Sequence, residues 1–230
     1  MNSLLDLVNY DNPRSFGSRL RRRRAAGVKV LIEAIFAERG SVRIIDLGGR
    51  RDYWRVFDAD FLRDNNVHIT LLNSEVTQLP SGSELGFASI AGDACDLFDH
   101  ADNAFDLVHS NSTVEHVGDW VRMEAFAREV ERLAPRHFIQ TPYFWFFIEP
   151  HFLTPFFHFL PEGLRAKMLM ANMVPHKGRE LNIGDAMRSV QGARLLDKAQ
   201  MSFLFPNSSV AFEWFGPLPK SIIATRSSLK

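Results

Sequence analysis

Short runs of apolar, largely β-branched residues recur along the first 140 residues and constrain the fold more than any other feature of this chain. The clearest run is VRIIDL at 42–47, which is almost continuously apolar, as is typical of a strand buried on both faces of a parallel sheet. We expect further strands of this kind at 67–72, 87–91, 105–109 and 137–140.

Stretches with helical periodicity separate these runs. Between 16 and 39 the apolar residues return at three- and four-residue spacings, and Gly40 supplies a C-terminal stop. A second apolar stripe lies within 119–133. Strands that alternate with helices predict a doubly wound α/β sheet, mostly parallel, whose ligand sites lie at the carboxyl ends of the strands.

The alternation stops after Gln140, where an aromatic segment, TPYFWFFIEPHFLTPFFHFLP, carries four of the 11 prolines. Such a segment should be irregular or only briefly helical. We therefore predict an insertion over 142–180, with regular structure resuming near Leu181.

The C-terminal part predicts one helix followed by an antiparallel hairpin. Asp197 and Gln200 have the spacing of a capping box, and the two hairpin strands are expected at 209–215 and 221–225. Because no linker or repeat divides the chain, we predict a single domain over 1–230. Its parts are an N-terminal helical cap (1–40), a ligand-binding core (41–141), the insertion (142–180) and the C-terminal helix and hairpin (181–230).

Composition excludes several classes of protein. The 230 residues are 46% apolar, and 27 basic residues balance 27 acidic ones, so a nucleic-acid partner is not expected. Cys95 is the only cysteine, which excludes an intrachain disulfide. Since no export signal or membrane-spanning run occurs, we expect a cytoplasmic protein.

The first predicted strand ends in RIIDLGGR, which places Asp46, Gly48 and Gly49 where the chain turns toward a helix. Glycines at such a turn allow the backbone to approach a ligand closely, and the carboxylate can accept hydrogen bonds. An ordinary tight turn between strand and helix would have the same residues.

The next two strand ends favour a ligand site. Asn73 ends the second strand, where a side-chain amide can bond a ribose diol, and Glu75 is a nearby alternative. The third strand ends in GDACDL, where Asp93 can accept from an exocyclic amine and the Ala94 backbone can meet a ring edge. Polar residues at three strand ends predict a nucleoside site.

Over roughly 42–141 the sequence resembles the class I S-adenosylmethionine-dependent methyltransferases, which have a Rossmann-like sheet. RIIDLGGR is similar to the first motif of that family, Asp-x-Gly-x-Gly, and GDACDLFDHADNAFDLVHSNSTVEHVGD is similar to its adenine motif and fourth strand. The resemblance implies S-adenosylmethionine as cofactor. It places Asp46, Gly48 and Gly49 at the methionine portion of the cofactor and Asn73 at the ribose. It places Asp93 and Ala94 at the adenine and Ser110 at the sulfonium.

Two residues depart from the family pattern. Arg50 stands where the motif has its last glycine, and Asn73 replaces the usual acidic residue. An arginine fits this position if its backbone is not left-handed, and an amide still binds a diol.

Glu115 and His116 resemble the Glu-His pair of ubiquinone-biosynthesis O-methyltransferases, some of which hold a cation with a further acid one helical turn earlier. Ser112 occupies that earlier position, so the sequence predicts no metal site. His116 is a candidate general base, because an unperturbed imidazole titrates near neutral pH. Alternatively, His116 packs beside the cofactor loop.

The insertion should overhang the acceptor side, where His151 is a polar group among aromatic residues and a second candidate catalytic residue. The resemblance and the aromatic segment together predict a small or lipid-linked organic acceptor. The aromatic residues could instead form core packing, or they could contact a membrane surface together with Arg19 and the arginines at 21–24.

Two other functions compete with methyl transfer. A nicotinamide-dependent oxidoreductase needs G-x-G-x-x-G, but Gly48-Gly49 is followed by Arg50, Arg51 and Asp52. A catalytically silent domain that binds the cofactor or a partner is compatible with Arg50.

Overall fold

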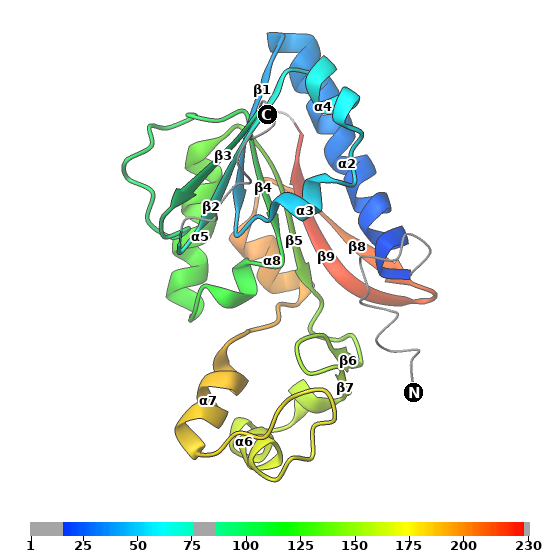
Figure 1. Ribbon diagram of the computed structural model, residues 1–230, viewed down its shortest axis with the longest axis vertical. Coiled ribbons are helices and arrows are strands. Elements are labelled where there is room, and N and C mark those ends of the chain that lie inside the picture. Colours follow the sequence, from blue (N-terminus) through cyan, green and yellow to red (C-terminus); the bar gives the residue numbers. More distant parts are fainter. Residues whose placement is uncertain (1–15, 76–85, 228–230) are drawn as a thin grey trace.

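A seven-stranded sheet forms the centre of the molecule in the computed structural model, which describes residues 16–75 and 86–227 (Figure 1). Its strand order is β3-β2-β1-β4-β5-β9-β8. The first five pair in parallel and β9 runs antiparallel to both of its neighbours, which confirms the predicted sheet. The strands are β1 (Val42–Leu47), β2 (Val67–Asn73), β3 (Phe87–Ala91), β4 (Leu107–Asn111), β5 (Arg136–Pro142), β8 (Ser209–Phe215) and β9 (Leu218–Arg226).

The strand order reverses between β1 and β4, since β1 pairs with β2 on one side and with β4 on the other. In open α/β sheets a crevice forms outside the carboxyl ends of the strands at such a reversal. The fold therefore brings the loops that follow β1, β2, β3 and β4 to one edge of the sheet.

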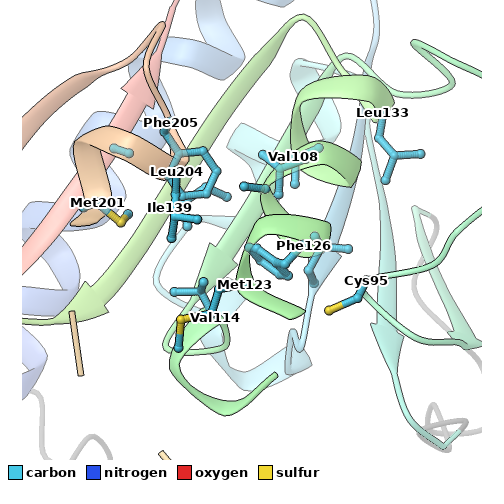
Figure 2. Close-up of a cluster of buried hydrophobic side chains, with 14 of the residues drawn as sticks. Cys95, Val108, Val114, Met123, Phe126, Leu133, Ile139, Met201, Leu204 and Phe205 are labelled. Atoms are coloured by element: carbon cyan, nitrogen blue, oxygen red, sulfur yellow. The ribbon is translucent and has the colours of Figure 1, made fainter. Parts of the chain in front are cut away.

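Helices cover both faces of the sheet. On one face α5 and α8 pack on apolar residues such as Val108 and Ile139, as Figure 2 shows with Phe126 of α5 and Leu204 of α8. The opposite face buries Ile44 of β1 with residues of α2 and α3. These helices are α2 (Phe16–Arg39), α3 (Arg51–Trp54), α4 (Ala59–Asp64), α5 (Trp120–Leu133) and α8 (Lys198–Leu204).

Side chains close the N-terminal ends of two of these helices. Asp119 accepts a hydrogen bond from the backbone N–H of Arg122 at the start of α5. At the start of α8, Asp197 and Gln200 form the predicted capping box. Each cap satisfies backbone donors that have no partner inside the helix, which fixes where the helix begins.

The insertion forms a lobe below the carboxyl end of β5, with a small core of its own that includes Phe152, Phe157 and Leu169 (Figure 1). The expectation that regular structure resumes only near residue 181 is wrong, because α6 begins at Glu162. The elements of the lobe are β6 (Ile148–Glu149), β7 (Thr154–Pro155), the 3-10 helix η2 (Phe157–Phe159), α6 (Glu162–Met170) and α7 (Ile183–Gln191).

The arginines of α2 do not form one solvated surface. Arg22 and Arg23 are exposed, but Arg24 is buried, with its Nε 3.2 Å from Glu213 and its Nη1 donating to Asn111. The cap before residue 16 and the side chain of Arg19 lie outside the described residues. Within 16–75 and 86–227, none of the helices has the length and hydropathy that a bilayer crossing requires.

Candidate cofactor and acceptor site

A cleft of about 580 Å³ lies at the carboxyl ends of the parallel strands. Its volume falls in the range of typical small-molecule sites, about 300–1,000 Å³. It has both apolar walls and polar side chains, including a carboxylate, a guanidinium and an imidazole. The lining residues are Gly48, Leu72, Asn73, Ser74, Gly92, Asp93, Ala94, Thr113, His116, Val117 and Arg122.

The glycine loop after β1 packs too tightly for side chains. Gly48 has a φ of +71°, and a Cβ there would lie 2.3 Å from the Oγ1 of Thr113. At Gly49 a Cβ would lie 2.1 Å from a carboxylate oxygen of Asp46. Arg50 is extended, with φ −120° and ψ 138°, so the arginine in place of the last glycine needs no left-handed backbone.

Asp46 lies beneath this loop and not among the residues that line the cleft. Its carboxylate is buried, accepting at 2.8 Å from the Nε1 of Trp54 and lying 2.6 Å from the Nδ1 of His109. Ser110 is also buried, and its hydroxyl donates to the carbonyl of Leu47. Both residues therefore hold the loop and β4 in place from inside the sheet.

Asn73, Asp93 and Ala94 line the cleft, as their strand-end positions predict. The Asn73 amide also donates to the Gly49 carbonyl at 3.0 Å, which ties the second strand end to the first. Two polar side chains and the backbone of Gly48 and Gly92 thus meet around one space.

Arg122, from the first turn of α5, is a cleft residue that the sequence reasoning missed. Its Nη2 donates to both carboxylate oxygens of Asp93, at 2.6 and 2.7 Å. This hydrogen bond, more than the opposing effect of burial, lowers the pKa of Asp93. The carboxylate is therefore ionised at neutral pH and remains a hydrogen-bond acceptor.

His116 brings the cleft into contact with the insertion. It ends the 3-10 helix η1 (Val114–His116), and its Nε2 lies 3.1 Å from the Nε2 of His151. His151 in turn directs its Nδ1 at the carboxylate of Glu149, 2.7 Å away. Although burial lowers it, the hydrogen bond and the charge of Glu149 raise the pKa of His151 above its usual value.

Glu115 lies beside the two histidines and is buried. Its Oε2 accepts from the hydroxyl of Thr141 at 2.9 Å, and burial raises the pKa of the Glu115 carboxyl. A Glu115 oxygen and one nitrogen from each imidazole all lie within 4.8 Å of one another. The structure thus adds a third candidate ligand, His151, to the Glu-His pair that the sequence reasoning judged insufficient for a metal.

Part of the insertion exposes large aromatic side chains. Trp145, Phe156 and Phe159 are 61%, 59% and 39% exposed, and the ring of Phe159 contacts both of the others. We call these three residues the aromatic surface. Other aromatic residues of the segment, such as Phe146, Phe152 and Phe157, are buried. Some aromatic side chains of the insertion therefore form core packing, and others face solvent.

Comparison with known proteins identifies the fold. Residues 59–136 match the family described as "Methyltransferase domain", and no curated protein matches. The methyltransferase CalH, solved in complex with SAH, is 12% identical with a TM-score of 0.53, covering 88% of this chain and 55% of CalH.

Two structures from Burkholderia thailandensis are less similar in fold. An O-methyltransferase family protein is 17% identical with a TM-score of 0.47, covering 94% of this chain. The 1,6-didemethyltoxoflavin-N1-methyltransferase is 12% identical with a TM-score of 0.49, covering 87% of this chain and 77% of its own. This chain spans 59% of the length of the O-methyltransferase family protein.

Proposed function

We propose that this chain is a class I S-adenosylmethionine-dependent methyltransferase, and that it methylates a small or lipid-linked organic acceptor at the edge of the cleft where His116 and His151 meet. The observation that carries the proposal is that one cleft joins the strand-end residues Asn73 and Asp93 to His116. The cofactor, when bound, supplies an electrophilic methyl group on a sulfonium.

The cleft residues suit the nucleoside part of S-adenosylmethionine. We assign Asp93 and the Ala94 backbone to the adenine and the Asn73 side chain to the ribose, with the Gly48 backbone facing the methionine portion. Asp46 and Ser110 support the cofactor-binding loop from inside the sheet, because their polar atoms form hydrogen bonds with other protein groups there. Cofactor affinity then depends directly on Asp93 and indirectly on Asp46.

Methyl transfer to a hydroxyl requires that the oxygen form a bond to the methyl carbon as the carbon–sulfur bond breaks. The electron pair stays on sulfur, and the hydroxyl proton must leave. The facing imidazole nitrogens of His116 and His151 are placed to receive that proton. Holding the acceptor in line and excluding water supply the rest of the catalysis.

The aromatic surface supports a lipid-linked acceptor in particular. Exposed Trp and Phe side chains favour the interfacial zone of a bilayer, and these three belong to the same segment as His151. An acceptor anchored in a membrane could then reach the histidine pair while the protein remains peripheral.

Calorimetric titration with S-adenosylmethionine and with S-adenosylhomocysteine tests the first step. Binding of both at one site per chain supports the proposal, and binding of neither refutes it. Cell-extract fractions incubated with deuterated-methyl cofactor then identify the acceptor by the mass of the added group. Cofactor binding without any labelled product would favour the alternative, a catalytically silent domain.

A further inference from the structure

In the contact between His116 and His151, the same ring nitrogen of each imidazole, Nε2, faces the other across 3.1 Å. The Nδ1 of His116 lies 2.6 Å from the carbonyl of Gly192, which can only accept, so this nitrogen carries the proton. The Nδ1 of His151 likewise donates to the carboxylate of Glu149. In the neutral imidazoles, two Nε2 lone pairs therefore point into the same space.

Glu115 adds a buried oxygen to this space. One carboxylate oxygen accepts from Thr141, whereas the other, Oε1, has no hydrogen-bond partner in the part of the chain that the structure describes. A buried carboxylate oxygen without a donor is costly unless a cation or a proton compensates it. A Glu115 oxygen lies within 4.8 Å of a nitrogen of each imidazole, so a cation in this space would compensate both the buried carboxylate and the two lone pairs.

We propose that Glu115, His116 and His151 bind a divalent transition-metal ion of the zinc type. Two imidazole nitrogens with one carboxylate oxygen favour such ions over magnesium or calcium, which prefer all-oxygen sites. With metal–nitrogen distances of about 2.0–2.1 Å, the 3.1 Å between the Nε2 atoms corresponds to an angle of about 98° at the ion. That angle lies between octahedral and tetrahedral geometry.

The surroundings of the three ligands match those of metal sites. Metal-binding histidines usually donate their second ring nitrogen to a carbonyl or a carboxylate, which fixes the tautomer. His116 does so to Gly192 and His151 to Glu149, whose other oxygen accepts from the Phe152 backbone. The site also has an entry path, because the His116 side chain borders the cleft.

The chemical consequence rests on the proposed function, although the binding itself does not. Three protein ligands leave a coordination position open for an oxygen of the acceptor. With the ion bound, the two Nε2 atoms hold the metal and no longer act as proton acceptors. A Lewis acid there would lower the pKa of a bound hydroxyl, which would lose its proton to solvent water, and the oxygen would then bond to the methyl carbon as the carbon–sulfur bond breaks. The acceptor class is then an oxygen nucleophile.

The test is a binding measurement on the full chain after treatment with a chelator, using Zn²⁺ in calorimetry and Co²⁺ in visible absorption. We expect one ion per chain, with the absorption bands of nitrogen- and oxygen-ligated Co²⁺. His151→Ala should weaken binding by at least tenfold, and Glu149→Gln by roughly 10- to 100-fold. His176→Ala, at an exposed position of the same lobe, is the matched control and should not change it.

Two results would overturn the proposal: an affinity of the native chain no higher than that of a folded His151→Ala variant, or tight binding that His116→Ala and His151→Ala both leave unchanged. Circular dichroism establishes that each variant is folded. Because S-adenosylhomocysteine can be titrated into the metal-free chain separately, failure of the metal site is distinguishable from failure of the methyltransferase assignment.

Discussion

Arg122 and Asp93 form an ion pair inside the cleft, with one guanidinium nitrogen 2.6 and 2.7 Å from the two carboxylate oxygens. Oδ1 also accepts from the Cys95 backbone. A carboxylate has about four acceptor positions, so Asp93 can hold Arg122 and still accept from an exocyclic amine. The ion pair orients the Asp93 carboxylate and leaves part of the carboxylate's hydrogen-bond acceptor capacity unused.

Asp93→Ala should therefore weaken cofactor binding more than it weakens folding. Loss of a hydrogen bond to a charged group costs about 1.5–3 kcal/mol, or roughly 10- to 150-fold in dissociation constant. Calorimetry with S-adenosylhomocysteine measures the effect. The matched control is Asp102→Ala. The Asp102 carboxylate is also paired with an arginine, Arg132, and it is 74% exposed. An unchanged affinity of the Asp93 variant would contradict the adenine assignment.

Gly49→Ala should destabilise the fold through Asp46. The new Cβ would collide with the carboxylate and displace it from Trp54 and His109, at a cost of about 1–3 kcal/mol in urea unfolding. Gly163→Ala, within α6 and with nothing within 4 Å of the added carbon, is expected to be neutral or slightly stabilising. Equal stabilities of the two variants would show that the loop relaxes freely.

His137 should make the fold sensitive to acid. Burial, together with the charge of Arg226, lowers the pKa of His137 to about 3 from the usual 6.5. Below pH 6.5 the unfolded chain binds a proton that the folded chain does not, so the free energy of unfolding falls as the pH falls. The loss attributable to His137 is about 2 kcal/mol between about pH 7.5 and pH 5.

Urea unfolding at both pH values measures this loss in the native chain and in His137→Gln. The glutamine keeps a polar group near Ser208 but cannot titrate, so the variant should lose less stability than the native chain. His68→Gln, at an exposed histidine, should behave like the native chain. A His137→Gln variant with the native pH dependence would disprove the prediction.

His151→Ala should lower turnover by roughly 10²-fold and leave cofactor affinity nearly unchanged, because the side chain contacts His116 and does not line the adenine end. Single-turnover kinetics with the identified acceptor measures the effect, with His176→Ala as control. Normal turnover combined with a lower melting temperature would identify His151 as a packing residue.

The aromatic surface should bind lipid. Replacing Trp145 and Phe156 by alanine should reduce co-sedimentation with vesicles of mixed neutral and anionic lipids. Phe98→Ala removes a side chain that is 78% exposed on the loop after β3, and it should have no effect. If the native chain does not sediment with vesicles, a small diffusible acceptor is favoured over a lipid-linked one.

The sheet was predictable because each buried parallel strand is a local apolar run. The strands at 42–47 and 87–91 have the predicted bounds. The sequence does not predict α6, because the aromatic, proline-rich stretch before it indicates irregular structure throughout the insertion. Its sequence, EGLRAKMLM, contains good helix formers from Leu164 onward.

The site was less predictable because its side chains meet across long separations. Asp46 and His109 are 63 residues apart, and Arg122 lies 29 residues from Asp93. The polar face of a helix looks the same whether it borders a cleft or bulk solvent. His151 was recognised as a polar group among aromatic residues, but its approach to His116, 35 residues earlier, follows from tertiary packing alone.

The lobe that carries His151 leaves the sheet and returns to it at neighbouring points, since Tyr143 and Leu196 form a β-bridge. Its core, with Phe152, Phe157 and Val190, is built from residues between those points. A segment with adjacent ends and its own packing can be exchanged between enzymes without redesign of the sheet. Under the proposed function, acceptor choice can therefore diversify in evolution, or be grafted by engineering, while the residues of the cleft at the ends of β2 and β3 stay the same.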